Sequence, residues 1–213
     1  MREGAIAAVL HAIDADHEVI IVNYSVWNQD FTRELHSELF KFDTDRAYPS
    51  GDDVHFFSDV ATGLTFIGSV VLHRSLWLSR RRPPYYGTEF IHVGVLFQAR
   101  LPGSALVLAK PFVGIRYGNA SWTGRTFAIW MFKWPMLIWS FTAYPESARA
   151  AVSARTVAQS AHPVLLSCDR RLLTHQNTIA TYITARHPAC GSCSPAQLRA
   201  FRARLPIPRG WAT

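Results

Sequence analysis

Hydrophobic and polar positions change period repeatedly along the first half of the chain, which predicts helices and strands in turn. Apolar residues at helical spacing predict a helix over Gly4–Ile13, and a β-branched run predicts a buried strand over Glu18–Tyr24. Trp27–Tyr48 is polar and has no clean period, so we expect a long excursion over the sheet. Ser50 is placed to cap the next helix, and Gly63 to end it.

The same pattern continues in the middle of the chain. A strand is predicted over Phe66–Leu72 and a short helix over Arg74–Leu78, before the Arg-Arg-Arg-Pro-Pro run at 80–84 breaks the chain into a loop. Thr88 is then placed to cap a helix that runs to about Arg100. One face of this helix is apolar and consists of Phe90, Val93, Phe97 and Leu101.

Two short strands follow, over Ala105–Ala109 and Phe112–Ile115. This alternation of strands and helices predicts an α/β domain with a mixed sheet flanked by helices. Beyond Tyr144 the chain is rich in Ala, Ser and Arg and predicts a helical C-terminal tail, with helices near Arg149–Ala161 and Thr174–Ala185. We therefore expect a domain over residues 1–144 and an extension over residues 145–213.

Charge is distributed unevenly along the 213 residues. Residues 1–69 carry 12 Asp/Glu and 4 Lys/Arg, whereas residues 70–213 carry 3 Asp/Glu and 18 Lys/Arg, so the halves have net charges of −8 and +15. Only Lys41, Lys110 and Lys133 are lysines. Arginine suits phosphate and lipid headgroups, although a genome that prefers arginine codons would give the same bias. No recognised nucleic-acid fold pattern appears, so we do not expect nucleic-acid binding.

The cysteines indicate a reducing compartment. Cys168, Cys190 and Cys193 are an odd number and cannot form a disulfide framework, and no signal peptide follows Met1, so we expect a cytoplasmic protein. His187 stands three residues before Cys190 and gives a metal-like spacing. A clear fourth ligand is lacking, so we expect an unmetallated loop there.

An apolar, aromatic segment over Phe127–Tyr144 raises the question of membrane contact. The run is shorter than the roughly 20 residues of a spanning helix, and Lys133 and Pro135 interrupt it. Its tryptophans favour a membrane interface. Core packing, docking at an anionic membrane surface and spanning all remain compatible with the pattern.

The candidate chemistry lies between Tyr85 and Arg125. Glu89 is the only Asp or Glu between Asp59 and Glu146, and it follows a Gly-Thr turn. A polar loop over Arg116–Arg125 follows the second short strand. A single acid after a turn and a polar loop after a strand indicate a site at the strand ends of an open sheet.

Three runs in this region carry a resemblance to a known family. The runs FIGSVVLHRSLWLSR, YYGTEFIHVGVLF and PFVGIRYGNASWTGRTFAIWMFKWPMLIWSF resemble the C-terminal part of family 2 glycosyltransferases. The similarity covers about Gly4–Tyr144 and is greatest to abequosyltransferase-like bacterial enzymes of surface-polysaccharide (O-antigen) assembly. It implies a GT-A-like fold and transfer of a sugar, with inversion, from a nucleotide-diphosphate donor to a lipid-linked saccharide.

The resemblance also implies roles for single residues. Gly87-Thr88-Glu89 stands where the family places its base, with threonine replacing the usual first acid, so Glu89 matches the catalytic base. The substrate-binding candidates are His92, Arg116, Asn119, Trp122 and Arg125, which are suited to a diphosphate, a sugar hydroxyl or a lipid headgroup. His92 stands three residues after Glu89, so both can face one cleft. Structural alternatives remain open: a first-turn Glu that stabilises the helix, a His with a hydrogen-bond partner, and a well-bonded loop.

The family's metal motif has no counterpart in this chain. Mg or Mn would bind acidic residues at the end of a strand just before a helix like Gly4–Ile13, so by resemblance the nucleotide-binding half is expected to be missing or separate. The pairs Asp14/Asp16 and Asp52/Asp53 are not expected to replace it. The alternative is a catalytically inactive, membrane-associated or partner-binding remnant, and either form would lie in the cytoplasm, peripherally on the inner membrane face.

Overall fold

The computed structural model describes residues 1–117 and 128–155, all within one compact unit, Met1–Leu165. The predicted helix over Thr174–Ala185, the three cysteines and His187 lie outside the described residues. Residues 146–155 are helical, in agreement with the helix expected near Arg149.

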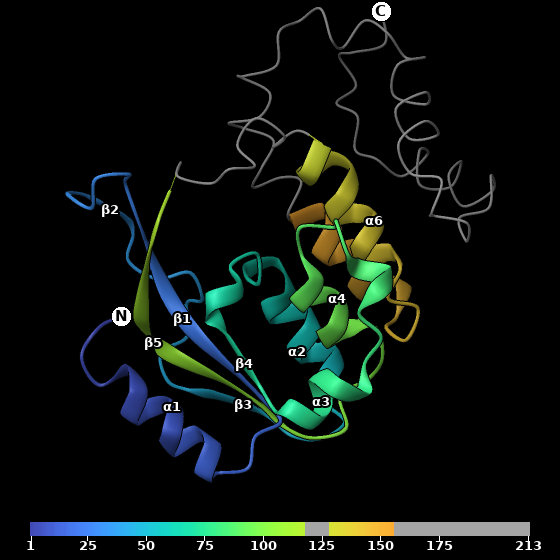
Figure 1. Ribbon diagram of the computed structural model, residues 1–213, viewed down its shortest axis with the longest axis horizontal. Helices are drawn as coiled ribbons and strands as arrows, with labels where there is room; N and C mark the ends of the chain where they lie inside the picture. Colours follow the sequence, from blue (N-terminus) through green and yellow to red (C-terminus); the bar gives the residue numbers. More distant parts are fainter. Residues whose placement is uncertain (118–127, 156–213) are drawn as a thin grey trace, which may run out of the picture. The chain divides into compact units, whose positions relative to one another are not determined.

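A curled mixed sheet forms the centre of the fold (Figure 1). Strand β1 (Val19–Trp27) is parallel to β5 (Ala105–Arg116). Antiparallel β2 (Glu34–His36) and β4 (Val70–Leu72) pair with opposite ends of β1, and antiparallel β3 (Arg46–Tyr48) pairs with the start of β5. The expected mixed α/β architecture, a sheet flanked by helices, is confirmed.

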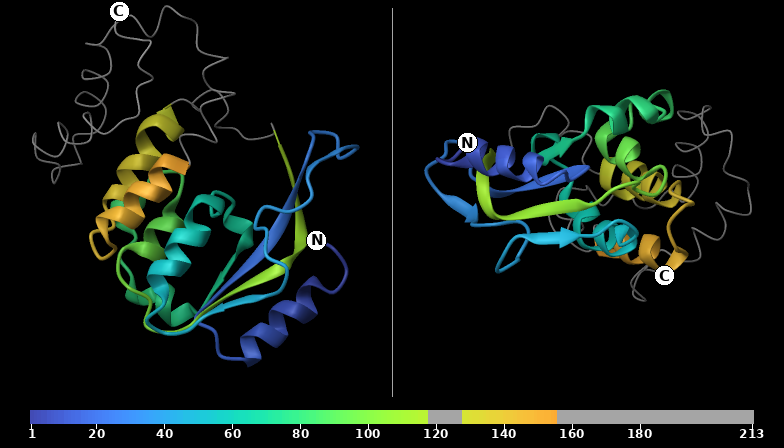
Figure 2. Two further views of the ribbon diagram at one scale, coloured as in Figure 1. Left: turned by 180° about the vertical axis from the view of Figure 1, so that it is seen from behind. Right: turned by 90° about the horizontal axis from the view of Figure 1, so that it is seen from below.

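Helix α1 (Ala5–Asp14) covers one face of this sheet (Figures 1 and 2). Ala5 and Ala12 of the helix pack against Ile20 and Val22 of β1, in a small core with Leu108 and Phe112 of β5. Alternate residues of the same strand, such as Val19 and Ile21, face the opposite core. The apolar run in β1 is therefore continuous because both faces of the strand are covered.

The second face is covered by α2 (Asp53–Val60), α4 (Ile91–Phe97) and α6 (Trp134–Trp139) (Figure 1). Aromatic rings make up much of this larger core, and edge-to-face contacts join them: the ring centroids of Phe57 and Phe97 are 5.0 Å apart, and those of Phe97 and Tyr144 are 5.8 Å apart. Helix α3 (Arg74–Ser79) lies at the periphery of the fold; along the chain it follows β4 and precedes the loop that leads to α4 (Figure 1).

Several predicted boundaries are corrected. The two expected strands over Ala105–Ala109 and Phe112–Ile115 form one strand, β5, whose pairing with β1 shifts register opposite Asn23. Of Phe66–Leu72, only Val70–Leu72 is a strand, and a 3-10 turn over Ile67–Ser69 precedes it.

Ser50 does not cap α2. Its hydroxyl donates to the Pro102 carbonyl at 3.2 Å, and Asp52 takes the capping position. Asp53 lies in the first turn, as expected, but its side chain is only 3% exposed and faces the Arg100 guanidinium at 2.5 Å. A buried carboxylate is costly without a partner, and this ion pair links α2 to the segment that follows α4.

The aromatic segment before Tyr144 is part of the core. A π-helical turn over Ile129–Lys133 leads directly into α6, and Pro135 is the second residue of α6. Trp134 and Phe141 are fully buried. Among the described residues, none of the helices has the length and apolar character needed to cross a bilayer.

Candidate functional site

Helix α4 begins later than its sequence pattern predicts. Its first residue is Ile91 and its last is Phe97, so it does not extend from Thr88 to Arg100. The Thr88 hydroxyl closes the preceding turn: it donates to the Tyr85 carbonyl at 2.8 Å and accepts from the Phe90 N–H at 3.2 Å. The predicted apolar face is confirmed, since Phe90, Val93, Phe97 and Leu101 are all buried.

Glu89 lies in this turn. Its backbone φ of 73° is in the left-handed region, which residues other than glycine and asparagine rarely adopt. The Lys133 ammonium donates to its carboxylate at 3.1 Å and to the Gly87 carbonyl at 2.9 Å. The side chains of Glu89 and Lys133 are 24% and 19% exposed. The carboxylate is thus held at the solvent edge, before the helix and not in its first turn.

His92 does not face a cleft with Glu89, contrary to the expectation from their spacing. Its side chain is buried, and its Nε2–H donates to the Leu64 carbonyl at 2.6 Å. Its Nδ1 has no hydrogen-bond partner among the residues that the structure describes. Burial lowers the pKa of His92 from 6.5, and the bond to Leu64 only partly offsets this. His92 therefore ties α4 to Leu64 as a neutral ring.

The burial of His92 predicts a pH-dependent stability. Above pH 6.5 the ring is neutral in both states, but below it the unfolded chain takes up a proton that the folded ring resists. The free energy of unfolding should therefore fall by up to about 1.4 kcal/mol per pH unit as the pH drops below 6.5. Urea unfolding at pH 7.5 and 5.5 measures this. His92→Gln should remove that part of the slope; equal slopes in the wild type and His92→Gln would contradict the prediction.

Arg116 is the last residue of β5 and pairs with Trp27 at the end of β1. Its guanidinium lies 5.0 Å from the centre of the Phe31 ring. The other three loop candidates, Asn119, Trp122 and Arg125, lie outside the described residues. Arg116 therefore belongs to a different neighbourhood from Glu89: the aromatic residues at the carboxyl ends of the parallel strands.

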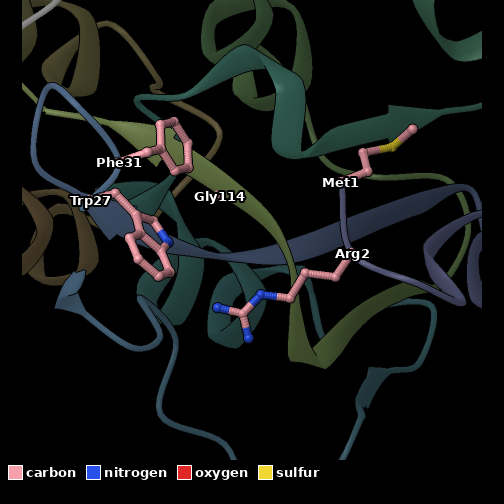
Figure 3. Close-up of a pocket in the computed structure, with 5 residues that line it drawn as sticks. All are labelled: Met1, Arg2, Trp27, Phe31 and Gly114. Atoms are coloured by element: carbon pink, nitrogen blue, oxygen red, sulfur yellow. The ribbon is translucent and has the colours of Figure 1, made fainter. Parts of the chain in front are cut away.

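A pocket of about 210 Å³ lies at these strand ends (Figure 3). Trp27 and Phe31 stack with ring centroids 5.6 Å apart and ring planes 21° from parallel. They lie over Gly114, where a Cβ atom would come within 3.3 Å of both side chains. Met1 and Arg2 complete the lining. Phe31 is 39% exposed and has a φ of 62°, so its ring is presented to solvent from a constrained turn.

Polar groups hold this aromatic pair in place. The Trp27 indole N–H and the Arg2 guanidinium both donate to the Ser25 hydroxyl, at 2.9 and 3.0 Å, and Arg2 also pairs with Glu34 at 2.9 Å. Aromatic faces beside charged and hydroxyl groups suit a ligand with one apolar face and a polar rim, such as a sugar ring. The sequence pattern did not predict this pocket. Its only local signal is an aromatic pair, Trp27 and Phe31, in an otherwise polar stretch.

Among the described residues, no group of three or more His, Cys, Asp or Glu side chains comes together as a metal site. Asp14 and Asp16 precede β1 instead of ending a strand, and Asp53 forms an ion pair with Arg100.

Comparison of the chain with protein-family models, curated proteins and solved structures gave no match. The chemistry of the site therefore rests on its own residues.

Proposed function

We propose that this chain serves the acceptor side of an inverting glycosyl transfer on a GT-A-like fold. The sugar would pass from a nucleotide-diphosphate donor to a lipid-linked saccharide of a cell-surface polysaccharide, at the cytoplasmic face of the membrane. The observation that carries the proposal is the conformation of Glu89: a carboxylate held in a left-handed turn before α4. Such backbone conformations are costly and gather at functional sites.

In the proposed reaction Glu89 acts as the base. Its carboxylate accepts the proton of an acceptor hydroxyl while the hydroxyl oxygen forms a bond to the anomeric carbon of the donor sugar. The bond from that carbon to the diphosphate oxygen breaks, and the diphosphate leaves with the electron pair. Lys133 positions the base, because its ammonium bonds both the carboxylate and the carbonyl of Gly87 in the same turn.

A non-catalytic saccharide-binding or partner-binding role is a second candidate. Two observations favour it: the Trp27/Phe31 pocket is not lined by Glu89, and the Glu89 carboxylate is in an ion pair with Lys133. In that role the aromatic pair would bind a sugar ring without transfer, and Glu89 would be a structural partner of Lys133.

An assay that needs no knowledge of the sugar separates the two candidates. The purified chain is incubated with a panel of nucleotide-diphosphate sugars and an extract of producing cells that supplies the polyprenyl-linked saccharides and any separate nucleotide-binding half, and released nucleoside diphosphate is measured. Release that depends on both the donor and the extract supports transfer. Saccharide binding that is lost in Trp27→Ala, without release for any donor, supports the binding role and contradicts the assignment of Glu89 as a base.

A further inference from the structure

The segment from Arg74 to Tyr86 is rich in arginine, and the proposed catalytic role does not use it. It comprises α3 and a following 3-10 turn, Pro83–Tyr85, and it contains four arginines and no Asp or Glu. Two apolar or aromatic side chains protrude among these arginines: Leu78 is 56% exposed and Tyr86 is 64% exposed. We refer to Arg74, Leu78, Arg81, Arg82 and Tyr86 as the arginine–tyrosine surface.

This surface is held in a defined conformation. The Gln98 side chain exchanges two hydrogen bonds with the backbone of Arg81, each 3.0 Å long. The Arg82 guanidinium donates back to the Trp77 carbonyl of α3 at 3.2 Å. The Tyr85 ring packs directly on Gly94, where a Cβ atom would come within 2.3 Å of the ring. Because Tyr85 anchors the end of the loop, the neighbouring Tyr86 points outward.

The positive charge of the surface is not neutralised within the described part of the chain. None of the four arginines there forms a salt bridge with a described carboxylate. Arg100 lies outside the segment; its carbonyl accepts from Arg80 at 2.6 Å, and its own guanidinium faces Asp53. Guanidinium groups with free N–H donors bind phosphate oxygens well.

We propose that the arginine–tyrosine surface docks the protein on an anionic lipid bilayer. Arginines near a bilayer surface are attracted to anionic headgroups, while Leu78 and Tyr86 are placed to enter the headgroup region, where tyrosine is favoured. A nucleic-acid ligand would use the arginines but gives no reason for the exposed Leu78. This inference goes beyond the proposed function and does not depend on it.

Two other apolar features fit a bilayer less well. The tryptophans of Phe127–Tyr144 were the sequence-based candidates for interfacial contact, but Trp134 is fully buried and Trp130 and Trp139 are half-buried. Helix α1 presents an exposed apolar stripe, Ile6, Leu10 and Ile13, but contains no arginine or lysine. Of these three features of the described chain, only the arginine–tyrosine surface combines exposed apolar side chains with arginines.

Co-sedimentation of the full chain with liposomes tests the proposal. Phosphatidylcholine vesicles with 30% phosphatidylglycerol, a composition chosen for the assay, are compared with pure phosphatidylcholine vesicles. Binding should require phosphatidylglycerol. Arg74→Gln/Arg81→Gln should lower the partition coefficient by about 25-fold, or roughly fivefold per arginine. Leu78→Ser/Tyr86→Ser should lower it about tenfold, since both side chains lose apolar burial.

Matched variants elsewhere provide the controls. Arg33→Gln/Lys41→Gln makes the same change in charge on exposed residues, and Ile6→Ser/Leu10→Ser removes equally exposed apolar groups, so both should bind like the wild type. Equal loss in control and test variants, or no dependence on phosphatidylglycerol, would overturn the proposal. So would retention on a DNA duplex that Leu78→Ser/Tyr86→Ser leaves unchanged, combined with absence of vesicle binding. No sugar is present in this assay, so its failure would leave the transfer proposal untouched.

Discussion

Replacing Glu89 by glutamine is expected to lower the rate of acceptor-dependent sugar transfer by about 10²–10⁴-fold, the range typical for loss of a general base. The amide has almost the same shape, and its carbonyl oxygen can still accept the hydrogen bond that the carboxylate accepts from Lys133 at 3.1 Å. It cannot take up the acceptor proton. Stability should change by only about 1 kcal/mol, because partly exposed ion pairs contribute little.

The measurement is the release of nucleoside diphosphate as a function of acceptor concentration. Glu146→Gln, at the next carboxylate along the chain, should leave turnover unchanged. Lys133→Gln breaks the same ion pair but keeps the carboxylate, so it should cost less turnover than Glu89→Gln. If Glu89→Gln keeps full turnover, or if the two variants lose it equally, Glu89 acts only as a partner of Lys133 and the assignment as base is wrong.

Replacing Asn23 by alanine is expected to destabilise the fold by about 4 kcal/mol, since each buried polar group left without a partner costs about 1–3 kcal/mol. The Asn23 amide is fully buried and donates to two carbonyls, those of Phe40 and Ala109, at 2.7 Å each. Its oxygen accepts from the N–H groups of Tyr24 and Phe40 at 2.9 and 3.0 Å. These bonds replace the backbone pairing that is interrupted where β1 and β5 shift register.

Urea unfolding at pH 7.5 gives the comparison. Ser153→Ala is the matched control: Ser153 is also a buried polar residue, but its hydroxyl has no hydrogen-bond partner among the described residues, so its loss should cost less than about 0.5 kcal/mol. A loss of under 1 kcal/mol for Asn23→Ala would show that water or a shifted backbone satisfies the carbonyls of Phe40 and Ala109, and that the amide does not determine the register.

Local patterns predicted which segments form elements better than where they begin. The apolar periods correctly located α1, β1, α3 and the buried face of α4, because burial of apolar side chains decides these segments whatever their neighbours are. They misplaced the caps. Ser50 and Thr88 are good capping residues, but the Pro102 carbonyl and the Tyr85 turn engage their hydroxyls instead. The partner of Ser50 is distant in the chain and cannot be read from propensity, whereas Thr88 bonds within a local turn that competes with capping.

For the candidate site too, the sequence predicted some features and missed others. The isolation of Glu89 among basic and apolar residues was visible in the sequence, and so was the turn before it. The spacing of Glu89 and His92 wrongly predicted a shared cleft, because the helix begins only at Ile91 and a one-turn relation needs both residues inside the helix. The pocket of Trp27, Phe31 and Gly114 joins strands far apart in the chain, so no local spacing could reveal it.

By itself the sequence determined the mixed α/β character, the apolar segments that form the core and the single acid that precedes α4, since these depend on composition and period along the chain. Only the tertiary structure decided the parallel pairing of β1 with β5, the ion pair of Lys133 with Glu89 and the burial of Trp134. The physical reason is that contacts between distant segments depend on the free energy of the whole packed core. The aromatic segment before Tyr144 is therefore compatible with a membrane interface when only its sequence is considered, whereas the fold buries Trp134 in the protein interior.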